Sequence, residues 1–197
     1  MSLAIDWKQL AWLSLREPKT AAAQILSWKV ERNTLWLLAT VVIICTTIVS
    51  VISNYLVPVP DPYASLVAQP FRLFMIMAGV FLISVHMLFW VGRALGGKGD
   101  MNDLLSLLVW LQILRAGAQV VVVIAVLLSP VLAAFLVLFV LVATLWILLN
   151  FTSIGLQLES LSRAFVVCLV TLFAIVFAIA LVGPMIGIGA LGVPANV

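Results

Sequence analysis

Apolar side chains are concentrated along this chain in five long runs, separated by short segments rich in proline, glycine or charge. A helix needs about 20 mainly apolar residues to cross a bilayer core about 30 Å thick. Each run is close to or above that length. The pattern therefore predicts an all-α integral membrane protein with five transmembrane helices, at residues 34–56, 71–95, 104–129, 131–150 and 164–182.

Proline and glycine mark the ends of the predicted spans. Three prolines at residues 58–62 follow the first span, and a Gly-Pro pair at residues 183–184 follows the last. Only Pro130 separates the third span from the fourth. An unbroken helix over residues 104–150 would be roughly 70 Å long, about twice the bilayer core. We therefore expect an antiparallel hairpin there.

The N-terminal segment has a different pattern. Leu3, Trp7 and Leu10 recur at helical spacing, and Pro18 is a good first residue for a second helix. Tryptophan suits the headgroup region, where its ring is buried and its N–H group stays hydrated. We therefore predict one or two amphipathic helices over residues 3–30 that lie on the cytoplasmic membrane surface. The predicted interfacial anchors are Trp7, Trp12 and Trp28, and the alternative is that this segment packs on the protein's own loops.

These patterns divide the chain into a cytoplasmic interfacial segment at residues 1–33, a five-span membrane domain at 34–184 and an apolar non-cytoplasmic tail at 185–197. Composition agrees, because 65% of the residues are hydrophobic and only 9% are charged. A soluble domain carries about 25% charged residues. The net charge of +3 is too small and too dispersed to predict nucleic-acid binding.

Lysine and arginine orient the spans, because short cytoplasmic loops carry an excess of these residues. Five of them lie in residues 1–33, and Arg93, Lys98 and Arg163 lie in or beside the second and fourth loops. The first loop has only Arg72 at its edge, and the third loop and the tail have none. We therefore expect the N-terminus in the cytoplasm and the C-terminus on the opposite side.

Arg115 is the most unusual residue in the predicted spans, since it lies about eleven residues into the third one, roughly 16 Å deep. A charge near the bilayer centre costs at least about 2.5 kcal/mol. Gln112 and Gln119 lie on the same helix face as Arg115. His86, in the second span, is expected at a similar depth. The sequence therefore predicts an intramembrane polar cluster of His86, Gln112, Arg115 and Gln119 between the second and third spans.

Two roles are open for this cluster. Polar groups in spans can hold helices together during assembly, or they can form a site for a ligand or a lipid. The predicted spans contain no Asp or Glu. Because proton-coupled transport normally uses a buried carboxylate, the sequence gives only weak support to coupled transport.

A glycine-rich segment ends the second span and consists of Gly96, Gly97, Lys98, Gly99 and Asp100. It lacks the spacing of a phosphate-binding P-loop, which needs GxxxxGK followed by Ser or Thr. We interpret it as a tight cytoplasmic turn. Asp100 or Asn102 is expected to cap the third span, and Asp103 adds negative charge at the positive end of that helix.

The spacings that are typical of enzyme active sites do not occur in the sequence. Cys45 and Cys168 lie inside apolar runs, and together with His86 they give no metal-ligand spacing. We therefore expect neither catalysis nor a metal or other cofactor.

Three segments resemble the Yip domain family, named from Ypt-interacting proteins, and in particular its short bacterial members. They are LREPKTAAAQIL at residues 15–26, GGKGDMNDLLSLLVWLQIL at 96–114, and LLNF with the polar turn after it, at 148–157. The resemblance implies five spans in a bacterial cytoplasmic (inner) membrane, a cytoplasmic N-terminus and no catalysis. Eukaryotic relatives bind small prenylated GTPases in vesicle traffic. They have a longer cytoplasmic N-terminal region than this chain, so small GTPase binding is not carried over.

Two functional hypotheses follow. The first is a non-enzymatic protein that organises or associates with other membrane components, for example as an accessory subunit of an inner-membrane complex. Its partners would be the lipid bilayer and either another membrane protein or a second copy of the chain. The alternative is a transporter, channel or lipid-translocating protein that uses the polar cluster between the second and third spans.

Overall fold

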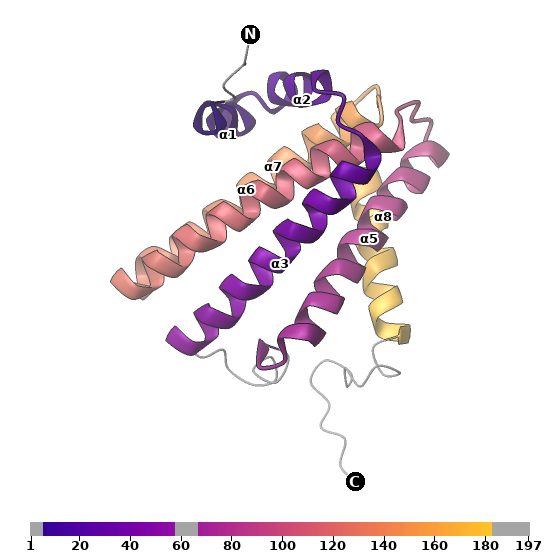
Figure 1. The fold of residues 1–197 in the computed structure, drawn as a ribbon. Helices are drawn as coiled ribbons and strands as arrows, with labels where there is room; N and C mark the ends of the chain where they lie inside the picture. The colour runs from indigo at the N-terminus through magenta and orange to yellow at the C-terminus, as the bar shows by residue number, and fades with distance from the viewer. Residues whose placement is uncertain (1–5, 58–66, 183–197) are drawn as a thin grey trace.

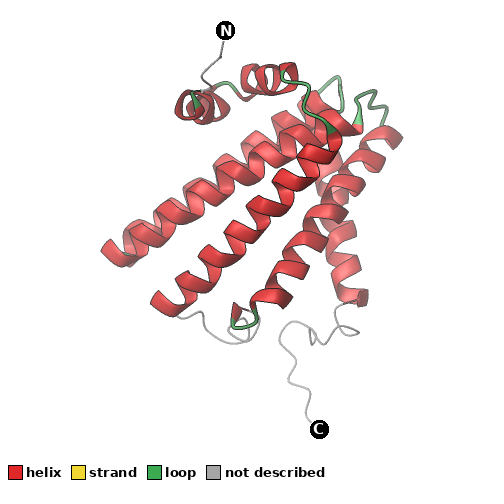
Figure 2. Ribbon diagram, viewed as in Figure 1, coloured by secondary structure: helices red, strands yellow, loops and turns green. Residues whose placement is uncertain are grey.

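A computed structural model describes residues 6–57 and 67–182 of the chain. Within these ranges all regular secondary structure is α-helical, as Figure 2 shows. The all-α prediction is therefore confirmed for the described residues. The three prolines at residues 58–62, the Gly-Pro pair at 183–184 and the predicted tail at 185–197 lie outside them.

Among the described residues, four helices are long and apolar enough to cross a membrane, and each corresponds to one of the first four predicted spans. They are α3 (Arg32–Leu56), α5 (Pro70–Ala94), α6 (Met101–Leu128) and α7 (Pro130–Gly155). The expected hairpin at Pro130 is present, with α7 beginning at that proline.

The predicted end of the fourth span, at Asn150, was wrong. Helix α7 continues five residues further, to Gly155. Asn150 is buried, and its amide Nδ2 donates a hydrogen bond to the Trp146 carbonyl oxygen at 2.9 Å. Because the polar side chain is satisfied by its own helix, it does not interrupt that helix.

The fifth predicted span corresponds to α8 (Leu161–Val182). The hydroxyl of Ser160 accepts a hydrogen bond from the backbone N–H of Arg163 at 3.3 Å, which caps the start of this helix. The apolar stretch described for α8, Leu161–Phe177, is shorter than the other four spans. Among the described residues, four helices therefore meet both the length and the composition of a membrane span, and the fifth span remains a prediction.

The five long helices converge at one end of the bundle (Figure 1). At that end α6 is the central helix, because all of its residues from Leu104 to Leu111 are buried. Away from it, α3, α6 and α7 diverge from α5 and α8, as Figure 1 shows. The apolar core is thus concentrated in the half of the bundle where the chain enters its first long helix.

Two short helices, α1 (Trp7–Arg16) and α2 (Pro18–Ser27), lie across the converged end (Figure 1). Their buried side chains share one apolar cluster with α6 and α7, formed by Leu10, Ala21, Ala22, Ile25, Leu107, Trp110, Leu111, Ile147 and Phe151. The prediction of one or two helices in this segment is confirmed. These two helices pack on the long helices α6 and α7, whereas the alternative prediction placed them on the protein's own loops. We call α1 and α2 the helical cap.

Candidate functional site

Arg115 lies at the middle of α6, fourteen residues after its first residue, Met101, which is about 21 Å along the helix axis. Its Nη1 atom donates a hydrogen bond to Gln112 Oε1, three residues earlier, at 3.2 Å. Gln119 instead donates from Nε2 to the Ser50 hydroxyl on α3, at 2.8 Å. The predicted polar stripe is present, but its residues divide between a local pair and a bridge to a neighbouring helix.

The structure does not bring His86 to this group. Its ring stacks on Trp36 of α3, with ring centres 6.2 Å apart, and its Nδ1 atom lies 2.8 Å from the Leu82 carbonyl oxygen. The part of α5 that faces the Arg115 side of the bundle contains Ser84. Two residues further along a helix, a side chain points to a different face, so depth alone was a poor guide to the position of His86.

Arg115 borders a cavity of about 390 Å³ that touches all five long helices. Most of the lining is apolar, and the polar atoms come from Thr46, Ser84, Gln112, Arg115, Thr144, Cys168 and Thr171. Thr171 is 4% exposed, and its hydroxyl has no hydrogen-bond partner among the described residues. A buried hydroxyl without a partner costs about 1–3 kcal/mol, so the cavity offers an unused hydrogen-bonding group.

The charge on Arg115 has no carboxylate partner in the described part of the chain. An ion pair in that part of the chain joins Arg163 to Glu159 and does not involve Arg115. The acidic residues of the sequence all lie outside residues 104–158, which hold most of α6 and all of α7. Since an unpaired cation at this depth is costly, Arg115 requires water or an anion from outside these helices.

Sequence reasoning missed Ser84, Thr144 and Thr171. The signal for Ser84 was available, because Phe81, Ser84 and Leu88 recur at the spacing of one helix face, and all three line the cavity. Thr171 carried no such signal, since a threonine in an apolar helix usually bonds to its own backbone. Only the packed structure shows that its hydroxyl is left without a partner.

The glycine turn at residues 96–100 packs on the turn that follows α7. The backbone N–H groups of Lys98 and Gly99 both donate to the Leu156 carbonyl oxygen, at 2.9 and 3.0 Å. A β-carbon at Gly97 would lie 2.8 Å from the Gly92 carbonyl oxygen, and one at Gly99 would overlap the carbonyl oxygen of the residue before Leu156. Gly96 has a positive φ of 91°, which favours glycine. The glycines are therefore required by close contact between two turns.

The predicted side-chain caps of α6 are not formed. Asp100 occupies the N-cap position, but its side chain makes no capping hydrogen bond. Asn102 instead donates from Nδ2 to the Val30 carbonyl oxygen at 3.1 Å, which ties the segment between α2 and α3 to α6. Asp103 does lie in the first turn of α6, where its charge favours the positive end of the helix.

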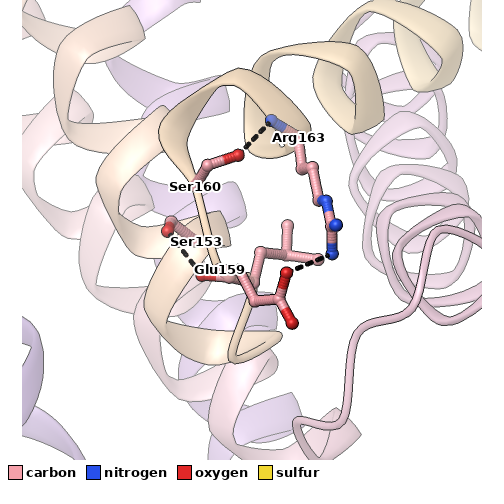
Figure 3. A network of polar contacts seen from close by, with 5 residues as sticks. Ser153, Glu159, Ser160 and Arg163 are labelled. Carbon is pink, nitrogen blue, oxygen red and sulfur yellow. Dashed lines mark hydrogen bonds and ion pairs between the residues drawn. The ribbon is translucent and has the colours of Figure 1, made fainter.

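Arg163 lies beside the same pair of turns. Its Nη1 atom is 2.9 Å from Glu159 Oε2, and Figure 3 shows the two side chains facing each other next to Ser160. Ser153, also in Figure 3, donates to the Leu158 carbonyl oxygen at 3.5 Å. Both members of the ion pair are exposed, so it contributes less than about 1 kcal/mol. This network belongs to the turn, and the cavity is lined by other residues.

Two of the predicted interfacial anchors, Trp7 and Trp28, meet Trp110 of α6. The ring of Trp7 stacks on Trp110 with centres 5.6 Å apart, and Trp28 meets it edge-on at 6.4 Å. The indole N–H of Trp110 donates to the Ser14 hydroxyl of α1 at 2.9 Å. These rings fasten the helical cap to the bundle. Trp12 is 57% exposed, and the interfacial role of the anchors stays a prediction.

Residues 12–182 match the family model of the Yip1 domain. The match covers the helical cap from Trp12 onward and all of the long helices. No curated protein matches the chain. No solved structure matches it either. The chain belongs to the Yip1 domain family, as the resemblance in its three segments predicted.

Proposed function

We propose that this Yip1 domain protein is a five-span, non-enzymatic membrane protein that associates with an anionic membrane component through Arg115. The observation that carries the proposal is the position of Arg115. It lies at the middle of α6 beside a cavity, with no carboxylate partner in the described part of the chain. A cation held there gains most when an anion from outside the chain neutralises it.

Two further observations support a fifth span and a cytoplasmic helical cap. Helix α8 packs beside α5 and α7, which both have spanning length. The helical cap, the glycine turn and the turn after α7 all lie at one end of the bundle (Figure 1). Because that end gathers Lys98, Arg163 and the basic residues of the cap, the positive-inside rule favours placing it in the cytoplasm.

The chemistry around Arg115 favours association over catalysis. Its described neighbours in the cavity are one amide, several hydroxyls, a thiol and apolar side chains. These groups hydrogen-bond an anion and fix its orientation, but they do not form an acid–base pair near neutral pH. A role as accessory subunit of an inner-membrane complex is one form of this association, in which a carboxylate of the partner would reach Arg115.

The test is purification of the tagged full chain from its native membrane in mild detergent, followed by mass spectrometry of bound proteins and lipids. The Arg115→Leu variant is compared with wild type. Gln119→Leu is the matched control. It removes a polar side chain from the same face of α6, but that side chain bonds to Ser50 within the bundle. We expect one anionic component to be lost with Arg115→Leu and kept with Gln119→Leu. If both variants keep every component of the wild type, the proposal is wrong.

A transporter or lipid-translocating protein is the second candidate. The observation in its favour is that the cavity touches all five long helices and contains the unpartnered hydroxyl of Thr171. A transporter must move its substrate across the membrane, whereas an associating protein only binds it. Full-length protein in vesicles should then move fluorescent anionic lipid between leaflets, and Arg115→Leu should stop that movement. Equal rates in protein-free vesicles would exclude lipid translocation.

A further inference from the structure

A second cavity, of about 400 Å³, lies between α1, α6 and α7. Helix α1 turns one face toward it, on which Lys8, Trp12 and Leu15 recur at helical spacing. Except for Lys8, Arg115 and Thr144, the residues that line it are aliphatic or aromatic. The space is therefore an apolar cavity under the helical cap with two cationic side chains on its lining.

Neither cation is neutralised within the described part of the chain. Lys8 is exposed on α1 and forms no ion pair there, and Arg115 bonds only to the neutral amide of Gln112. Arg115 borders both this cavity and the five-helix cavity. Lys8 is at the converged end of the bundle, and Arg115 is deeper along α6. An occupant with charge complementarity would place a negative group near these cations and an apolar part along α6 and α7.

We infer that this cavity binds one anionic phospholipid, with the phosphate held by Lys8 and Arg115 and an acyl chain against α6 and α7. The inference rests on the proposed function and names the anionic component. A free phosphate would leave the apolar lining uncovered. A partner helix about 10 Å across would need more than the 400 Å³ of this cavity over the same length, whereas a single acyl chain does not.

The position of the site suits a lipid. The lining of α6 and α7 extends over residues 111–118 and 139–147, which is about 12 Å along each helix. Trp12 is exposed beside Lys8, where an indole would meet the headgroup region of a bilayer. The helical cap thus covers a space that runs from Lys8 and Trp12 at the capped end of the bundle to Arg115, deeper along α6.

The test measures lipid binding to the purified full chain in uncharged detergent by native mass spectrometry. Phosphatidylglycerol is titrated against phosphatidylcholine with the same acyl chains. Lys8→Gln removes one cation, and Ala143→Leu fills the apolar part of the cavity. Lys19→Gln, on exposed α2 surface, and Ala134→Leu, on the exposed face of α7, are the matched controls. Thermal unfolding of each variant checks that it is folded.

We expect wild type to bind one phosphatidylglycerol and to prefer it to phosphatidylcholine. Lys8→Gln should weaken that binding about fivefold, the usual contribution of one basic residue near an anionic headgroup. Ala143→Leu should weaken it at least as much, and both controls should bind as wild type does. Equal binding of the two lipids would overturn the inference.

The outcome also separates this inference from the proposed function. If Arg115→Leu loses its native component while Lys8→Gln and Ala143→Leu bind phosphatidylglycerol like wild type, the site under the cap is wrong and the function of Arg115 stands. If a co-purified protein carboxylate replaces the lipid, the inference is overturned in the same way. If Arg115→Leu loses nothing from native membranes, both proposals fail.

Discussion

The contact between the glycine turn and the turn after α7 predicts a large effect for Gly99→Ala. A β-carbon at this position would lie 2.6 Å from the Leu156 Cα atom. Since carbon atoms in contact are about 3.5 Å apart, one turn must move by about 1 Å. The obstacle is backbone on both sides, so no side-chain rotation relieves it.

A shift of that size also breaks hydrogen bonds. The N–H groups of Lys98 and Gly99 share the Leu156 carbonyl oxygen at 2.9 and 3.0 Å, and both contacts would exceed bonding distance. Two lost hydrogen bonds cost about 2 kcal/mol, and the overpacking itself adds about 1 kcal/mol at the lower end of its range. We therefore expect Gly99→Ala to lower the free energy of unfolding by about 3 kcal/mol.

The assay is reversible unfolding in mixed micelles by titration with sodium dodecyl sulfate, followed by tryptophan fluorescence. Gly117→Ala is the matched control, because a β-carbon at that position in α6 meets no atom within 4 Å. Its free energy of unfolding should equal that of wild type or exceed it by up to about 1 kcal/mol, because alanine is favoured over glycine inside a helix. If Gly99→Ala unfolds at the same midpoint as Gly117→Ala, the close contact between the turns is not the reason for the glycine.

Three further predictions concern single contacts, each measured by the same unfolding assay. Ser14→Ala should destabilise the protein by about 1–3 kcal/mol, because it leaves the buried indole N–H of Trp110 without its acceptor. Limited proteolysis of this variant should then release α1 first. Cleavage of α1 at the wild-type rate would contradict the prediction. Thr171→Val should raise the free energy of unfolding by about 1 kcal/mol, since it replaces an unpartnered buried hydroxyl with a methyl group; a loss of stability would show that the hydroxyl has a partner. Glu159→Gln should change stability by less than about 1 kcal/mol, because its ion pair with Arg163 is exposed and screened by salt; a larger effect at high salt would refute that estimate.

Much of the fold could be predicted from the sequence because membrane helices leave a simple signal. Apolar runs bounded by proline and glycine located α3 and α5 to within two residues. The end of α7 differs from the prediction, because the polar residue Asn150 indicates a boundary in the sequence although the helix continues through it. Its hydrogen bond to the preceding turn is a local feature that hydropathy does not report.

The site was harder to predict because it depends on which faces of the helices meet. Arg115 and Gln112 could be paired from their spacing alone, since both lie on one helix. His86 was assigned to them by depth, yet the rotation of α5 turns it toward Trp36. Rotation about a helix axis is set by packing against several neighbours, and a single apolar run carries little information about it.

The structural roles of the glycines and tryptophans could likewise be predicted only in part from the sequence. Tryptophan near a predicted span end indicated an interface, but the stacking of Trp7 on Trp110 involves residues 103 positions apart in the chain. The GGKGD turn was predicted as a turn, and its contact partner at Leu156 became known only from the packed structure. Long-range contacts of this kind have no signature in one sequence.

The central claim, that an external anion neutralises Arg115, is tested most directly by solid-state NMR of the full chain in native membranes. Arginine is labelled with ¹³C at the guanidinium carbon, and the Arg115 signal is identified by its loss in Arg115→Leu. The account predicts that this signal shows dipolar contact with a lipid phosphorus or a carboxylate carbon. An Arg115 guanidinium that contacts only water and Gln112 would contradict it.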